Sequence, residues 1–137
     1  MRKLTLPPNV LFHQDLRLIV WRPRGVLNET AVNIIITFLA KLEASSSKPF
    51  NRFTDTSEVD AVDLNFRYIF HVSLFRRLSY VGRPPVKSAI LVTNATSAQY
   101  SKVHALLTQG SPLKVRIFEV RDEAAEWLGV SKETLEY

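Results

Sequence analysis

Five short stretches of the chain have the apolar patterns expected of β-strands. These strands are predicted at residues 9–14, 16–22, 50–55, 86–93 and 113–118. The second stretch places Leu18 and Val20 on one face and Ile19 on the other. The fourth contains an unbroken apolar run, which indicates a strand buried on both faces by helices. The last carries Lys114 and Arg116 between apolar residues, a pattern typical of a strand at the edge of a sheet.

Apolar residues recur every three or four positions in four longer segments, which predicts four amphipathic helices. They are expected between Asn28 and Ser45, and at residues 64–80, 97–109 and 122–128. Asn28 is a suitable N-cap for the first helix, and Gly110 is placed to end the third. The alternation of strands and helices predicts an α/β fold with a mostly parallel sheet of four or five strands and about four helices. The length of 137 residues suits one domain, predicted over residues 1–137.

The second predicted helix is apolar on two sides, which is unusual for a helix at a protein surface. One apolar stripe contains Phe66, Phe70, Leu74 and Leu78, and the other contains Tyr68, Val72 and Phe75. Apolar area on this scale usually marks an interface, so the second stripe is the candidate for a homodimer contact or for a hydrophobic ligand. Burial beneath the first strand or a loop is the remaining alternative.

Composition and charge narrow the function classes without naming one. The chain is 46% hydrophobic and 23% charged, with a formal net charge of +5 and an isoelectric point near 9.7. Its cations are spread along the sequence and few aromatic residues lie between them, a pattern that does not favour nucleic-acid binding. No segment has the apolar length needed to span a membrane, and the chain contains no Cys, so a cytoplasmic location is expected.

A group of cations surrounds the end of the second predicted helix. It contains Arg76, Arg77, Arg83 and Lys87. Positive charge at this position complements the helix dipole, which is the plainer explanation for the group. Binding of a phosphate or of an acidic partner is the functional alternative.

The chemistry-bearing residues give no catalytic pattern. Asp55, Glu58, Asp60 and Asp63 place four carboxylates close together, but they lack the glycine turn of a calcium loop. We expect them to lie in a solvated loop, with Asp63 as the N-cap of the second helix, and we predict no metal and no cofactor. The three histidines lie on different elements, and no nucleophile elbow or phosphate-binding glycine loop is present. The prediction is therefore a protein that is not an enzyme.

Two segments carry a family resemblance. Residues 55–66, Asp-Thr-Ser-Glu-Val-Asp-Ala-Val-Asp-Leu-Asn-Phe, resemble the strand-to-helix loop of STAS domains, the module of anti-sigma-factor antagonists. Residues 117–129, Ile-Phe-Glu-Val-Arg-Asp-Glu-Ala-Ala-Glu-Trp-Leu-Gly, resemble the tail of the SpoIIAA-like proteins, small bacterial relatives of STAS often grouped with Sec14-type lipid-binding folds. Within that tail, Trp127 is expected to clamp the last helix over the sheet, a structural role.

The resemblance implies a bacterial regulatory module that binds a protein partner. The recognition residues that it implies are Asp55, Thr56, Ser57, Asp63, Leu64, Asn65 and Phe66. In the family a phosphorylatable Ser follows the last Asp, and here Leu64, Asn65 and Phe66 follow Asp63, so control by a kinase does not carry over. Thr56 and Ser57 are expected to bond local backbone groups. A carrier of a small hydrophobic, lipid-like ligand is the alternative function.

Overall fold

The computed structural model describes residues 6–46 and 48–136, which covers most of the predicted domain. Its main sheet has five strands in the order β1-β2-β4-β6-β7. They are β1 (Val10–His13), β2 (Leu18–Trp21), β4 (Asn51–Asp55), β6 (Val86–Leu91) and β7 (Leu113–Phe118). β1 and β2 are antiparallel, and every other neighbouring pair is parallel. The predicted α/β fold with a mostly parallel sheet is confirmed, and β7 lies at the edge as its charges predicted.

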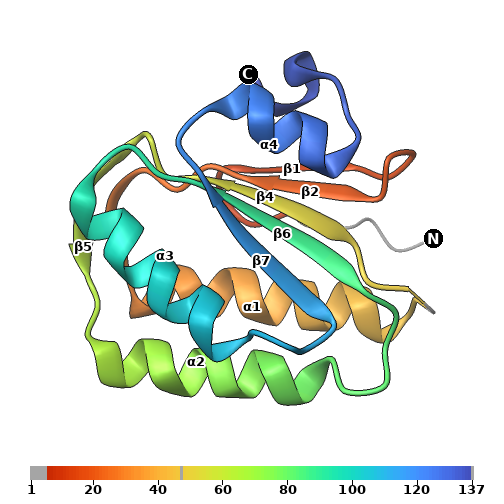
Figure 1. Cartoon of the computed structure of the whole chain (residues 1–137), viewed down its shortest axis with the longest axis horizontal. Coiled ribbons are helices and arrows are strands. Elements are labelled where there is room, and N and C mark those ends of the chain that lie inside the picture. The colour runs from red at the N-terminus through yellow and green to blue at the C-terminus, as the bar shows by residue number, and fades with distance from the viewer. Residues whose placement is uncertain (1–5, 47, 137) are drawn as a thin grey trace.

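Helices cover both faces of this sheet (Figure 1). The helices α1 (Glu29–Ala44), α2 (Phe66–Ser79) and α3 (Ala95–Leu107) lie on one face. The helix α4 (Arg121–Leu128) and the short 3-10 helix η1 (Lys132–Leu135) lie on the other. α2 is the helix farthest from the sheet in this view, with α1 and α3 nearer to the strands. This arrangement leaves α2 with one side toward the interior and one side toward solvent.

Successive side chains of β2 point to opposite faces of the sheet, and this alternation determines which helices each residue contacts. Leu18 and Val20 are buried in the core beneath α4, together with Phe53. Ile19 points the other way and packs against Phe38 of α1. The predicted role of Trp127 agrees with this arrangement, because its ring packs on that of Phe118 at 5.7 Å and the residue joins the core beneath α4.

Two strands were missed by the sequence prediction. β3 (Gly25–Asn28) and β5 (Val59–Asp63) pair in parallel as a separate two-stranded sheet. The prediction that residues 55–66 form a loop is therefore wrong for β5. Asp has a low strand propensity, so the presence of Asp60 and Asp63 argued against a strand in the sequence. The formation of β5 also depends on pairing with β3, which is distant in the sequence.

The caps of the helices are partly as predicted. The side chain of Asn28 accepts a hydrogen bond from Ala31 N at 3.0 Å, which confirms it as the N-cap of α1. The prediction of Asp63 as the N-cap of α2 is wrong, because Asn65 Oδ1 accepts from Tyr68 N at 2.8 Å and Asp63 ends β5. α3 ends at Leu107, so Gly110, with φ of +84°, lies in the turn that follows.

Candidate functional site

A cavity of about 140 Å³ lies between the main sheet and the helices α1, α2 and α3. Strands β2, β4 and β6 supply one side of it, and α2 closes the opposite side through Ile69 and Val72. Its lining is mostly apolar, as in sites that bind small organic molecules. The lining residues are Ile19, Trp21, Leu27, Val32, Ile35, Ile36, Leu39, Arg52, Thr54, Thr56, Leu64, Ile69, Val72, Arg76, Ser88, Ile90, Tyr100, Ser101 and His104.

Arg52 brings a positive charge to the sheet side of this cavity. It lies on β4 in register with Ile19 and Ser88, and only 4% of the residue is exposed. Its Nη2 donates to Glu43 Oε2 at 2.9 Å and to the hydroxyl of Tyr80 at 2.8 Å. A cation so deeply buried needs such partners, because an isolated charge is costly to remove from water.

Glu43 is the centre of the network that compensates Arg52. Its carboxylate also accepts from the backbone N–H of Phe50 at 2.8 Å and from the hydroxyl of Tyr80. Burial and the adjacent carboxylate raise the pKa of Tyr80 to about 12, although the charge of Arg52 acts in the opposite direction. Tyr80 therefore stays a neutral hydrogen-bond donor to Glu43, and the carboxylate is fully engaged.

Part of the Arg52 guanidinium has no such partner. Nε and Nη1 are buried, and neither forms a hydrogen bond within residues 6–46 and 48–136. Nε carries one N–H and Nη1 carries two, so these donors are left unmatched on a side chain that lines the cavity. Buried donors without acceptors are rare in folded proteins, and each calls for an explanation.

A serine and a histidine meet beside the same cavity. Ser73 Oγ lies 2.7 Å from His104 Nδ1, a distance also found in nucleophile and base pairs. However, Ser73 is completely buried and does not line the cavity, and His104 has no carboxylate partner among the described residues. Burial, with a smaller contribution from Arg52, lowers the pKa of His104 to about 4. The imidazole is thus neutral near pH 7 and bonded to a serine that a substrate cannot reach.

Two tyrosines tie α2 to α1 at opposite ends of the helices. The hydroxyl of Tyr68 donates to Asn33 Oδ1 at 2.6 Å near the start of both helices, and Tyr80 reaches Glu43 at the end of α1. Between these ties lies a second hollow of about 180 Å³, lined by both helices. Arg76 borders both the hollow and the cavity, so it lies where the two adjoin.

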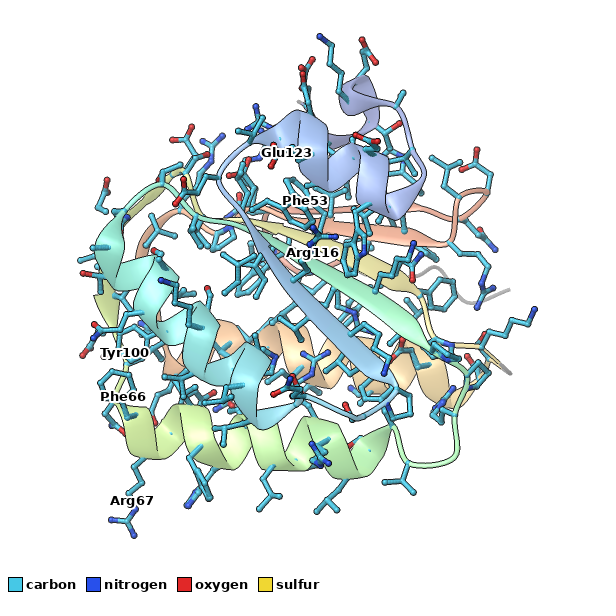
Figure 2. All side chains as sticks on the ribbon, viewed as in Figure 1. Phe53, Phe66, Arg67, Tyr100, Arg116 and Glu123 are labelled. Atoms are coloured by element: carbon cyan, nitrogen blue, oxygen red, sulfur yellow. The ribbon has the colours of Figure 1, made fainter. Side chains whose placement is uncertain are left out.

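The solvent side of α2 carries a row of exposed apolar side chains, here called the outer face of α2, with the exposed residues Arg67 and His71 among them. Its residues are Phe66, Phe70, Leu74, Phe75 and Leu78, together with Val81 just beyond the helix, and they are between 46% and 69% exposed. Four of them recur every fourth residue, so they share one side of the helix. Side chains along this edge of the fold project away from it, as labelled Arg67 does (Figure 2).

The sequence pattern favoured the stripe of Tyr68, Val72 and Phe75 as the dimer or ligand face, and the structure divides these residues. Val72 lines the cavity, Tyr68 is tied to α1, and Phe75 is exposed. The more exposed stripe is the one that begins at Phe66. The spacing of apolar residues shows that two sides of α2 are apolar, but it does not show which side faces the sheet. The sequence alone therefore could not identify the exposed stripe.

The predicted recognition residues at the end of β4 have structural partners. The prediction that Asp55 lies in a solvated loop is wrong, because the residue ends β4 and is completely buried. Its Oδ2 lies 3.2 Å from Arg22 Nε and 2.9 Å from Arg121 Nη2. Burial raises the pKa of Asp55, but hydrogen bonds from Ser57 and Arg121 and the charge of Arg22 outweigh it, so the pKa lies below 3.8. Thr56 is buried too, and its hydroxyl donates to Leu91 O on strand β6 at 2.7 Å, so the prediction of a bond to a local backbone group is wrong for Thr56.

The remaining predicted recognition residues lie at or near the surface. Ser57, Asp63, Asn65 and Phe66 are exposed, and Leu64 is half-buried at the cavity. Phe66 stacks on Tyr100 with ring centroids 4.9 Å apart, a pair labelled in Figure 2. Within the described residues, no group of three or more His, Asp or Glu side chains is placed to hold a metal ion.

Sequence reasoning missed Arg52, Glu43, Tyr80 and His104, which lie at or beside the cavity. One signal was available for Arg52. It precedes Phe53 in a predicted strand, and a charge at the inward position of a central strand is unusual. Glu43 and Tyr80 gave no signal, because charged and aromatic residues near helix ends are common at solvated positions.

Comparisons with known proteins support the fold and leave the function open. No protein-family model matches the chain, and no curated protein matches it. Among solved structures, the chain is similar to an uncharacterized protein of the DUF3478 family with a SpoIIAA-like fold from Shewanella loihica PV-4. The identity is 16%, the TM-score is 0.57, and the match covers 87% of this chain and 90% of the other. The predicted SpoIIAA-like fold is confirmed. In the described part of the chain, no helix has the length and apolarity to cross a membrane.

Proposed function

We propose that the protein is a non-catalytic interaction module that forms a homodimer through the outer face of α2. The observation that carries this proposal is the row of six exposed apolar side chains along that face, from Phe66 to Val81. Monomeric proteins rarely expose apolar patches of this kind without a function. The regulatory setting and a protein partner remain predictions from the STAS resemblance, and a cytoplasmic location remains a prediction from the composition of the chain.

The size of the surface suits a second copy of the chain. Six half-exposed side chains with roughly 100 Å² accessible each would bury on the order of 1,000 Å² between two copies. That area is near the lower limit for a specific interface, so we expect a dimer that dissociates on dilution. Two-fold symmetry places the same patch on both copies, which makes an apolar row self-complementary.

An antiparallel arrangement of the two helices brings their apolar rows together. It brings Phe66 of one copy toward Leu78 of the partner subunit, and Phe70 toward Leu74 of the partner subunit. Arg67, which projects from the start of α2 in Figure 2, then lies near the carboxyl end of the partner helix. The partial negative charge of the unpaired carbonyl groups at that end offsets part of the repulsion between Arg67 and the two cations of the last turn, Arg76 and Arg77 of the partner subunit.

The geometry at Ser73 supports the non-catalytic part of the proposal. Its hydroxyl is buried against His104, outside the cavity lining, so it is not available as a nucleophile. Mutation of Ser73 to Ala is then expected to change stability and not to remove an activity.

Sedimentation equilibrium of the purified protein across a wide concentration range tests the dimer. Leu74→Glu places a charge in the proposed contact and is expected to give a monomer at every concentration. Leu16→Glu is the matched control, since Leu16 is 44% exposed in the β1–β2 turn and Leu74 is 46% exposed. A wild-type protein that stays monomeric into the millimolar range would refute the proposal.

A second candidate function is the binding of a small hydrophobic ligand. The cavity of about 140 Å³ between the sheet and α2 favours it, because Val72 and Ile69 present apolar surface to an interior space. Native mass spectrometry of freshly purified protein tests this candidate, with added mass that is lost on unfolding as the expected result.

A further inference from the structure

We propose that the cavity beneath α2 binds a small organic carboxylate, whose charged group accepts hydrogen bonds from the guanidinium of Arg52. The proposal deepens the second candidate function, ligand binding, and rests on it. It does not depend on dimer formation through the outer face of α2. Two separate observations carry it, the apolar cavity and the unmatched N–H donors of Arg52.

The position of Arg52 indicates the chemistry of the ligand. Its Nη2 is occupied by Glu43, Tyr80 and the carbonyl of Phe50, whereas Nε and Nη1 are buried and unmatched within the described residues. A ligand that supplies acceptor oxygens removes the cost of these buried donors. Carboxylates suit the guanidinium best among small organic groups, because both are planar and opposite in charge.

The charges around the cavity favour an anion over a cation. The lining residues include Arg52 and Arg76 and no carboxylate. Glu43 lies outside the lining, and its oxygens already accept from Phe50, Arg52 and Tyr80. Glu43 therefore offsets the charge of Arg52, and the half-buried Arg76 adds positive potential where the cavity meets the hollow between α1 and α2.

The volume limits the apolar part of the ligand. A cavity of about 140 Å³ is close to the engineered apolar cavity of about 150 Å³ that admits one benzene molecule. Side chains such as Ile35, Val72 and Ile90 surround this space, so the body of the ligand is expected to be a single ring or a short chain. The long acyl chains of a membrane lipid do not fit within it.

Benzoate and benzamide make a matched pair of probes, because they share size and shape and differ in charge. We expect benzoate to bind the full chain at least about tenfold more tightly than benzamide in isothermal titration calorimetry, since a hydrogen bond to a charged group is the stronger one. The ¹⁵N-edited NMR signal of the Arg52 Nε–H is expected to shift with benzoate. A merely structural Arg52 would show no such shift.

Three variants locate the binding. Arg52→Lys keeps a charge beside Glu43 and is expected to reduce the preference for benzoate, whereas Arg116→Lys on the exposed surface of β7 is the control and should leave it unchanged. Val72→Phe fills the cavity and is expected to abolish binding of both probes. If Arg52→Lys fails to fold, the affinity ratio and the Nε–H shift in the wild-type protein decide the question.

The possible failures are distinguishable. Equal affinities for benzoate and benzamide, both lost in Val72→Phe, would overturn carboxylate recognition and leave ligand binding standing. Absence of binding by both probes at millimolar concentration would overturn the carboxylate proposal together with the ligand-binding candidate. Binding of benzoate that survives in Val72→Phe would place the site outside this cavity and would also refute the proposal.

Discussion

Replacement of Asp55 by Asn should destabilise the protein through charge alone, because the two side chains have nearly the same shape. The carboxylate lies between Arg22 and Arg121, and it also accepts from the backbone N–H of Ser57 at 2.9 Å. The amide oxygen of Asn can still accept from Ser57. The substitution therefore keeps the local turn and removes the negative charge from a completely buried position.

The expected cost is about 3 kcal/mol at neutral pH, the lower end of the range for removal of one partner from a buried ion pair. The lower end applies because the side chain of Arg121 is 32% exposed and can be hydrated, and because Arg22 Nη2 keeps its hydrogen bond to Leu135 O at 2.7 Å. With a urea dependence of roughly 1.5 kcal/mol per molar, the unfolding midpoint should fall by about 2 M. Asp63→Asn is the matched control at an exposed carboxylate, where we expect a change of less than about 0.5 kcal/mol.

The pH dependence provides a second check of the same reasoning. The pKa of Asp55 in the folded protein lies below its ordinary value of 3.8, so the unfolded state binds the proton first as the pH falls. The contribution of Asp55 is therefore complete above pH 3.8 and is lost as the pH falls through the folded-state pKa. Urea unfolding of wild type and Asp55→Asn should give a difference that is constant at neutral pH and shrinks in acid. A difference below about 1 kcal/mol at pH 7, or one that persists unchanged to pH 2, would refute the assignment.

Three further outcomes follow from buried polar groups and caps. Burial lowers the pKa of His104 to about 4 in the folded protein, below its ordinary value of 6.5, so stability should be complete above pH 6.5 and fall by at most about 3 kcal/mol as the pH drops toward 4. His104→Gln should abolish this loss in pH-dependent unfolding. Tyr80→Phe removes a buried hydroxyl that donates to Glu43 and should cost about 1–3 kcal/mol in chemical unfolding, whereas Tyr68→Phe at a more exposed bond should cost less than about 1 kcal/mol. Asn65→Ala removes the cap of α2 and should cost about 1 kcal/mol, whereas Asn65→Ser should retain most of the stability, as measured by thermal unfolding.

Much of the fold follows from patterns with local physical causes. The two faces of β2 follow from the alternation of Leu18, Ile19 and Val20, and the start of α1 follows from a side chain at Asn28 that caps its own helix. Such features depend on neighbours in the sequence. The parallel order of the strands then follows from the helices that separate them.

The candidate site depends on contacts that no local pattern contains. Glu43 and Tyr80 are far apart in the sequence, and each looks like an ordinary residue at a helix end until both meet Arg52. Strand β5 also depends on a distant contact, because it forms a strand only by pairing with β3. The STAS resemblance identified the β4 to α2 region, but burial divided it, with Asp55 in an internal ion cluster and Phe66 on the surface.

The two apolar sides of α2 allow the two proposals to be tested separately. Val72 faces the cavity and Leu74 faces solvent, although only one residue separates them in the helix. Val72→Phe is therefore expected to abolish benzoate binding and to leave the sedimentation of the dimer unchanged, and Leu74→Glu is expected to do the reverse. The polar ties at Tyr68 and Tyr80 hold α2 against α1 from both ends, so a change on one side has little reason to move the other. If either variant alters both measurements, the helix responds as one unit, and the assignment of separate roles to its two sides is wrong.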